Sequence, residues 1–210
     1  MRLTKFGHAC VRIEHDGQVI VIDPGVFSEP EAVDGATAVL VTHEHVDHWE
    51  ASRLGRTDAV IETIGAVAAQ FPPELAERTL VHSPGGRPEI GVPTQLVGEK
   101  HAVIYKDLPY FDNSGFLLEV GGLRVFHPGD ALTVPSEPVD VLMLPVSAPW
   151  LKVSECIDYA IAVGAPRNVP IHDAVYSEAG LGIVMTHLGR FLEPHGQAVE
   201  RLADGQDLPL

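Results

Sequence analysis

The chain has 210 residues, of which 45% are hydrophobic, and this is enough for one well-buried core and short for two, so we expect a single domain over 1–210. Acidic residues outnumber basic ones 29 to 14, and the net charge of −15 repels phosphate backbones and anionic membrane surfaces, so we expect neither nucleic acid nor membrane as a partner. No stretch resembles a signal peptide or a membrane span, so we expect a soluble, cytoplasmic protein.

The first third of the chain carries the signals of a hairpin followed by separate strands. Asp16-Gly17 is a typical two-residue hairpin turn, and Pro72-Pro73 should end a helix. In chain order we expect hairpin strands at 11–15 and 18–22, strands at 38–41 and 59–62, and a helix around 65–70.

The remainder predicts a second hairpin and then alternating strands and helices. Gly121-Gly122 marks the hairpin turn, and Ser154 is the expected N-cap of the first long helix. We expect strands at 94–97, 116–120, 123–126, 139–144 and 168–171, a helix at 154–163, an amphipathic segment at 182–191 and a helix-to-strand unit near 197–202. Hairpins indicate antiparallel pairing and strand-helix-strand units indicate parallel pairing, so the expected fold class is α/β with a mixed sheet covered by helices.

One short run in the chain has the composition of a metal site. The sequence Thr42-His43-Glu44-His45-Val46-Asp47-His48 follows an apolar strand and places three imidazoles and a carboxylate within six positions. Such a string arises by chance in roughly one of several hundred chains of this composition. Neutral imidazole and carboxylate are usual ligands of zinc, manganese and iron, whereas the alternative is a solvated polar turn. The run therefore favours a metal-binding loop.

Other predicted strands also end in polar side chains. Asp130 follows the strand at 123–126, Ser147 follows the strand at 139–144, and His172 follows the strand at 168–171. In layered α/β folds reactive groups gather in the loops after the carboxyl ends of strands. We therefore expect these side chains to meet the histidine-rich loop.

The two hairpins bring further residues to that edge. If the first hairpin has no bulge, continued pairing puts His8 opposite Gly25, beside the expected active edge. The same bulge-free pairing, continued beyond the second hairpin, puts Asn113 opposite Asp130. We therefore expect the segment 112–114 to hold the metal ligands in place from outside.

The chain resembles hydrolases of the metallo-β-lactamase superfamily, and within it the short branch that includes ascorbate-6-phosphate lactonase-like and uncharacterised metal-dependent hydrolases. Five motifs carry the resemblance: Gly7-His8-Ala9-Cys10, Ile22-Asp23-Pro24-Gly25, the histidine-rich loop, Val125-Phe126-His127-Pro128-Gly129-Asp130, and Val169-Pro170-Ile171-His172. They span residues 7–172 in the order that the family shows. The resemblance implies a four-layer αββα sandwich with mixed sheets and a dinuclear site at one sheet edge.

Carried onto this sequence, the resemblance also implies a set of metal ligands: His43, His45 and a downstream histidine for the first metal, Asp47, His48 and His172 for the second, and Asp130 as the bridge. We assign the downstream histidine to His101, which follows the strand at 94–97. His82 is the alternative, and we expect it to be a loop residue. The competing interpretations are a packed core histidine at 172 and a turn or N-cap aspartate at 130.

Several neighbouring residues are candidates for catalysis or support. Asp47, beside the second metal, is expected to orient the nucleophile or pass a proton to the leaving group, and His8 is expected to contact substrate or bond a ligand carboxylate. Asp23 either braces the histidine-rich loop or is a turn residue. Trp150 and Tyr110 either line a pocket or seal the core.

These residues favour a metal-dependent hydrolase that uses two divalent ions, with zinc first and manganese or iron as alternatives. The expected substrate is a small ester-like molecule, which is a lactone, a phosphodiester or an amide. An iron-dependent oxidoreductase of the same fold, a nuclease-type phosphodiesterase and a metal-binding scaffold without turnover stay open, as does a homo-oligomer. The nuclease needs a basic groove, and the sequence offers only isolated basic residues.

Overall fold

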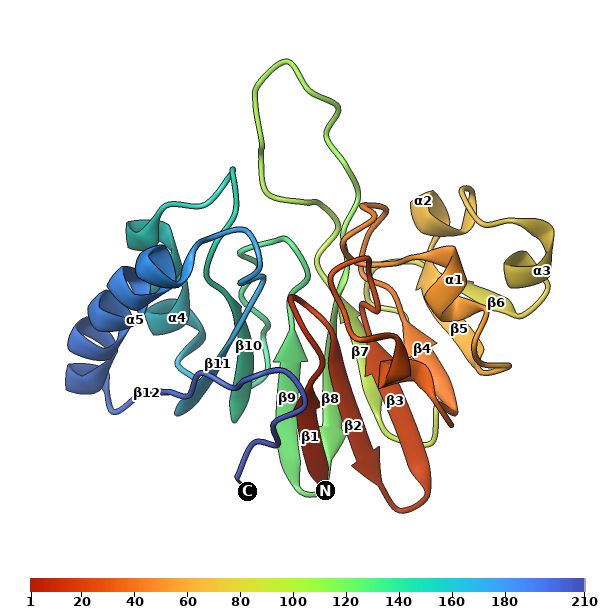
Figure 1. Ribbon diagram of the computed structural model, residues 1–210, viewed down its shortest axis with the longest axis horizontal. Coiled ribbons are helices and arrows are strands. Elements are labelled where there is room, and N and C mark those ends of the chain that lie inside the picture. Colours follow the sequence, from red (N-terminus) through yellow and green to blue (C-terminus); the bar gives the residue numbers. More distant parts are fainter. Residues whose placement is uncertain (210) are drawn as a thin grey trace.

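The computed structural model describes residues 1–209 and contains two six-stranded sheets with helices beside them (Figure 1). The first sheet has the strand order β1 (Arg2–Lys5), β2 (Val11–His15), β3 (Gln18–Ile22), β4 (Ala38–Leu40), β5 (Val60–Ile64) and β6 (Thr79–His82). The second has the order β12 (Ala198–Val199), β11 (Arg167–Ile171), β10 (Val141–Pro145), β9 (Leu123–His127), β8 (Gly115–Val120) and β7 (Thr94–Val97). The helices are η1 (Pro30–Val33), α1 (Ala51–Leu54), α2 (Gly65–Ala68), α3 (Pro73–Ala76), α4 (Val153–Val163), α5 (Glu178–Leu192) and η2 (Glu193–His195).

Both sheets are mixed and follow the same plan. In the first, β1, β2 and β3 pair antiparallel, and β3 to β6 continue in parallel. In the second, β7, β8 and β9 pair antiparallel, and β9 to β12 continue in parallel. Figure 1 shows α1 to α3 beside the first sheet and α4 and α5 beside the second. The α/β class and the αββα layering expected from the sequence are confirmed.

Alternating side chains of the second sheet separate two hydrophobic cores. In β8, Phe116 and Leu118 belong to the cluster shared with the first sheet, whereas Leu117 between them packs with α4 and α5. In β10, Met143 and Leu144 divide in the same way. Successive side chains of a strand point to opposite faces, so one apolar strand lines both cores. This explains why these strands read as continuous apolar runs rather than as alternating ones.

Both hairpin registers agree with the sequence prediction. Val11 pairs with Ile22, and Phe116 pairs with His127, as bulge-free two-residue turns require. Ser154 is not the N-cap of α4, because the helix starts one residue earlier, at Val153. The Glu155 side chain accepts the backbone N–H of Lys152, the residue before the helix. That carboxylate completes the first turn from inside the helix, so a serine cap is not needed there.

Short elements were the hardest to predict. The helix expected around 65–70 is only α2, Gly65–Ala68, and the proline pair begins the further short helix α3, because a proline at the first helical position costs nothing. The unit near 197–202 contributes only β12, Ala198–Val199. His82 is not a loop residue but ends β6. No helix within residues 1–209 combines the length and the apolar character needed to cross a bilayer.

Seven loops that follow the carboxyl ends of strands lie at one edge of the sandwich. They supply His8 after β1, Asp23 after β3, the histidine-rich loop after β4, His101 after β7, Asp130 after β9, Ser147 after β10 and His172 after β11. Because the two sheets share this edge, side chains from both sheets can face a common point. The candidate site is built there.

Candidate metal centre

Asp23 holds the histidine-rich loop in place. Its Oδ1 accepts the backbone N–H of Thr42 at 2.8 Å, and its Oδ2 accepts the Thr42 hydroxyl at 2.7 Å and the ring Nδ1–H of His48 at 2.7 Å. Asp23 is fully buried and has a φ of 52°, a conformation that Asp tolerates better than most residues. The bracing role proposed for Asp23 from the sequence is the one that the geometry supports.

Two close contacts between backbone segments make this arrangement possible. A side chain on Gly25 would have its Cβ 1.9 Å from the carbonyl oxygen of Asp47, so only glycine lets the turn after β3 pass under the histidine-rich loop. Gly129 has a φ of 63°, and a Cβ there would lie 2.3 Å from Oδ1 of Asn113. Both glycines therefore set how closely the loops approach one another.

The first cluster contains His43, His45, His101 and Asp130, and each offers a nitrogen or oxygen atom within 4.8 Å of the others. The Thr42 hydroxyl donates to Asp23, so it accepts Nδ1–H of His43 at 3.0 Å and leaves Nε2 of His43 to face the cluster. The Nδ1–H of His101 donates to the carbonyl of Ala102 in the same manner. Such second hydrogen bonds set the tautomer and direct the other ring nitrogen.

The second cluster contains His8, Asp47, His48 and His172 within the same 4.8 Å limit. His172 has a φ of 58°, and its Nδ1–H donates to the carbonyl of Ser147, so its Nε2 points inward, 3.4 Å from Oδ2 of Asp47. The Nδ1–H of His48 is taken by Asp23, which leaves its Nε2 directed at the same place.

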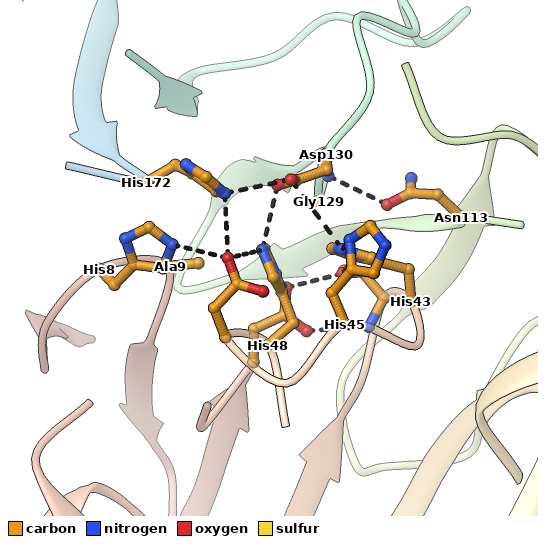
Figure 2. A network of polar contacts seen from close by, with 12 residues as sticks. His8, Ala9, His43, His45, His48, Asn113, Gly129, Asp130 and His172 are labelled. Atoms are coloured by element: carbon orange, nitrogen blue, oxygen red, sulfur yellow. Dashed lines mark hydrogen bonds and ion pairs between the residues drawn. The ribbon is translucent and has the colours of Figure 1, made fainter. Parts of the chain in front are cut away.

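Asp130 lies between the two clusters (Figure 2). Its Oδ1 is 3.1 Å from Nε2 of His48, and its Oδ2 is 3.1 Å from Nε2 of His172 and 3.4 Å from Nε2 of His101. The register predicted for the second hairpin brings Asn113 against it, because the Asp130 N–H donates to Oδ1 of Asn113 at 3.0 Å. A carboxylate that reaches histidines of both clusters has the position expected of a bridge.

Four buried atoms at this point lack hydrogen-bond partners among residues 1–209: Nε2 of His48, Nε2 of His101, Nε2 of His172 and Oδ1 of Asp130. These atoms lie near one another, but their angles do not allow hydrogen bonds between them. Buried polar atoms are nearly always satisfied, and leaving one without a partner costs about 1–3 kcal/mol. Divalent cations accept electron pairs from all four, so the residues present fit metal ions of the zinc, manganese or iron type.

The electrostatics of the site favour positive charge. Burial alone would raise the pKa of the Asp130 carboxyl, yet the adjoining His48 and His172 hold it well below its usual value. Against the opposing effect of burial, Asp130 raises the pKa of His172 to about 9 and that of His48 well above its usual value. The buried carboxylate thus stays ionised and draws protons onto its neighbours, and a bound cation would take the place of those protons.

His8 makes a defined pair of hydrogen bonds in the second cluster. Its Nδ1 accepts the backbone N–H of Ala174 at 3.2 Å, so the ring proton is on Nε2, which faces Oδ2 of Asp47 at 3.3 Å. Burial lowers the pKa of His8, although the bond to Asp47 acts in the opposite direction. A neutral ring that donates from Nε2 bonds the carboxylate and has no electron pair free on that atom for a metal.

The structure brings all of the predicted ligands together and places His82, the alternative to His101, outside them. His101 lies in the first cluster, whereas His82 pairs with the buried carboxylate of Glu62 on the neighbouring strand. Trp150 reaches the site, with its Nε1 3.1 Å from Oδ2 of Asp130, but Tyr110 is 58% exposed in the loop between β7 and β8.

One supporting residue was missed from the sequence. His127 is fully buried at the end of β9, where its Nε2–H donates to the Ala9 carbonyl at 2.8 Å and its Nδ1 accepts the Gly129 N–H at 3.2 Å. It joins the loop after β1 to the loop that carries Asp130. The only signal in the sequence is a histidine that ends an apolar strand, directly before the Pro-Gly-Asp turn.

Comparisons with known proteins identify the family of the chain. The family model of the beta-lactamase superfamily domain matches residues 2–172, a range that contains both clusters. Protein Rv0786c of Mycobacterium tuberculosis is 38% identical over 201 residues, which cover 92% of each chain. A UPF0173 metal-dependent hydrolase of Carboxydothermus hydrogenoformans is 30% identical, over 82% of this chain and 84% of the relative. The solved structure of Igni18, a metallo hydrolase from Ignicoccus hospitalis, superposes with a TM-score of 0.74 at 19% identity, over 99% of this chain and 97% of that one. The chain belongs to the beta-lactamase superfamily.

Proposed function

We propose that the protein is a hydrolase that depends on two divalent metal ions and acts on a small ester-like substrate. One observation carries the proposal: the buried Nε2 atoms of His48 and His172, one from each sheet, lack hydrogen-bond partners among residues 1–209 and face the same carboxylate, Asp130. The relatives named metal-dependent hydrolases support the same conclusion. When bound, divalent ions lower the pKa of a water and polarise the oxygen under attack.

The side chains divide this work between them. His43, His45 and His101 would hold one ion, and Asp47, His48 and His172 the other, with Asp130 between them. Asp47 is half-buried and bonds to His8, so it is placed to orient a nucleophile or to move a proton toward a leaving group. Nitrogen and oxygen donors without a cysteine favour zinc first, and manganese or iron as alternatives.

A cavity beside the second cluster supports a small substrate. It has a volume of about 420 Å³, and His8, Phe27 and Tyr176 are among the residues that line it. Pockets for small ligands have volumes of a few hundred cubic ångströms. The net charge of −15 opposes a polyanionic substrate such as nucleic acid. A lactone, a single phosphodiester or an amide fits these limits, and the resemblance of the motifs to the ascorbate-6-phosphate lactonase-like branch favours a lactone among them.

The proposal is tested with protein stripped of metal and reloaded separately with zinc, manganese and iron. Each form is assayed with a lactone, a phosphodiester and an amide, and we expect turnover of one class with at least one metal. His45→Ala should abolish it, because the first cluster loses a ligand, while circular dichroism stays that of the native protein. His195→Ala is the matched control, since His195 is exposed and far from the clusters along the chain. Iron binding without hydrolysis would replace this proposal with the oxidoreductase alternative.

A further inference from the structure

Trp150 contacts the shared carboxylate and both halves of the metal centre. Its Nε1–H donates to Oδ2 of Asp130 at 3.1 Å, whereas Oδ1 has no hydrogen-bond partner among residues 1–209. The indole ring also lies edge-on to His101, with ring centroids 5.7 Å apart, and edge-on to His172, with centroids 6.3 Å apart. One side chain therefore touches the carboxylate and one histidine from each cluster.

The position of this side chain does not depend on Asp130 alone. Trp150 lies in the loop between β10 and α4 and packs against the core between the second sheet and its helices. The next residue, Leu151, is buried in that core, and its N–H donates to the carbonyl of Ala148 at 3.2 Å. The ring is thus held by packing, and its N–H is presented to Asp130 from a fixed place.

We propose that Trp150 is a positioning residue, which holds the Asp130 carboxylate in the orientation that lets both of its oxygens serve metal ions. The terminal torsion of an aspartate is broad, so a carboxylate without a fixed partner rotates. A hydrogen bond to an ionised carboxylate is about twice as strong as one between neutral groups, which is enough to select one orientation. This inference rests on the proposed metal centre, because the orientation matters only when ions occupy it.

Trp150→Phe removes the N–H and keeps an aromatic ring in the loop. Metal-free wild-type and variant proteins are titrated with Co²⁺ against a chelator, and the visible absorption of the bound ions is recorded. Loss of a supporting hydrogen bond to a metal ligand typically weakens metal binding by about 10–100-fold. We expect a loss of that size in Trp150→Phe together with a changed cobalt spectrum. Tyr110→Phe is the control, because Tyr110 is exposed and lies outside both clusters, and it should leave both readouts unchanged.

A second measurement needs no variant at position 150. The chain has two tryptophans, so its ¹⁵N spectrum contains two indole N–H signals, and Trp49→Phe assigns them. Adding Zn²⁺ should shift the Trp150 signal and slow its exchange with solvent, because its acceptor becomes a metal ligand. An unshifted signal in a protein that binds two ions, or unchanged cobalt affinity and spectrum in Trp150→Phe, would overturn the role of Trp150 and leave the metal centre intact. A wild-type protein that binds no ion would overturn both.

Discussion

The backbone N–H of His172 donates to the carbonyl of His8 at 3.0 Å, and their rings lie with centroids 4.0 Å apart. His8 follows β1 of the first sheet and His172 follows β11 of the second, and both have a positive φ. Backbone strain of this kind costs about 1–3 kcal/mol per residue and persists where the surroundings determine the conformation. This contact joins the two sheets directly at the second cluster.

The hydrogen bonds of His8 predict that it takes part in catalysis without binding a metal ion. Because its Nε2–H faces Asp47, His8→Ala should keep both metal ions and lower turnover by about 100-fold or more, the usual range for a lost proton-transfer group. Elemental analysis and steady-state kinetics on the same preparation check this. If the variant holds only one ion even at saturating metal concentration, His8 is a ligand and its assignment is wrong.

The hydrogen bonds of Asp23 predict a strong effect from a side chain that belongs to neither of the two proposed ligand clusters. Asp23→Asn keeps the size but replaces one acceptor oxygen by a donor, which cannot accept the bonds from Thr42 and His48. We expect metal affinity to fall by about 10–100-fold and the free energy of unfolding to fall by about 1–3 kcal/mol. Chelator competition and urea unfolding measure the two. Wild-type metal affinity in this variant would show that the bracing is dispensable.

The close contact at Gly25 predicts that any larger residue at this position displaces the histidine-rich loop. Gly25→Ala places a methyl group 1.9 Å from the Asp47 carbonyl, so the histidine-rich loop must move, at a cost of about 1–3 kcal/mol. Metal binding should weaken with it. Gly182→Ala is the matched control, since a Cβ there meets nothing within 4 Å, and alanine within a helix is favoured by about 1 kcal/mol. Equal thermal stability of the two variants would refute the close-approach argument.

The raised pKa of His172 predicts opposite pH dependences for the metal-free and metal-loaded protein. Asp130 raises it from 6.5 to about 9 despite burial, so the folded metal-free protein keeps a proton that the unfolded chain releases. The resulting stabilisation is full below pH 6.5 and is lost as the pH rises toward 9. Metal binding needs the neutral ring and strengthens over the same range.

Scanning calorimetry between pH 6.5 and 9 tests this prediction. The melting temperature of the metal-free protein should fall with rising pH, and the difference between the zinc-loaded and metal-free proteins should widen. His187→Ala serves as the control, because His187 lies on α5 outside both clusters and should leave the profile unchanged. A difference that stays constant over the whole range would contradict the proton-for-metal exchange.

Local patterns were sufficient to predict much of the fold and the grouping of the candidate ligands. The bulge-free register of the second hairpin places Asn113 against Asp130 because pairing in a hairpin follows directly from its turn. The apolar runs of β4, β9 and β11 identify where ligand loops begin, because loops after the carboxyl ends of neighbouring strands meet at one edge.

The remaining features depend on contacts between segments far apart in the chain. His127 bonds the carbonyl of Ala9, 118 residues away, and no spacing within either segment indicates that contact. The bond from Trp150 to Asp130 depends on the path of the loop between β10 and α4, where no repeating pattern constrains the backbone. The prediction of Ser154 as the cap of α4 was wrong for a local reason instead, because the side chain of Glu155 inside the helix already accepts the backbone N–H of Lys152.

The central claim is that two cations share Asp130, and anomalous diffraction from zinc-loaded crystals tests it most directly. The account predicts two anomalous peaks, one beside His43, His45 and His101 and one beside Asp47, His48 and His172, with the Asp130 carboxylate between them. A single peak, or a second peak outside these clusters, would contradict it.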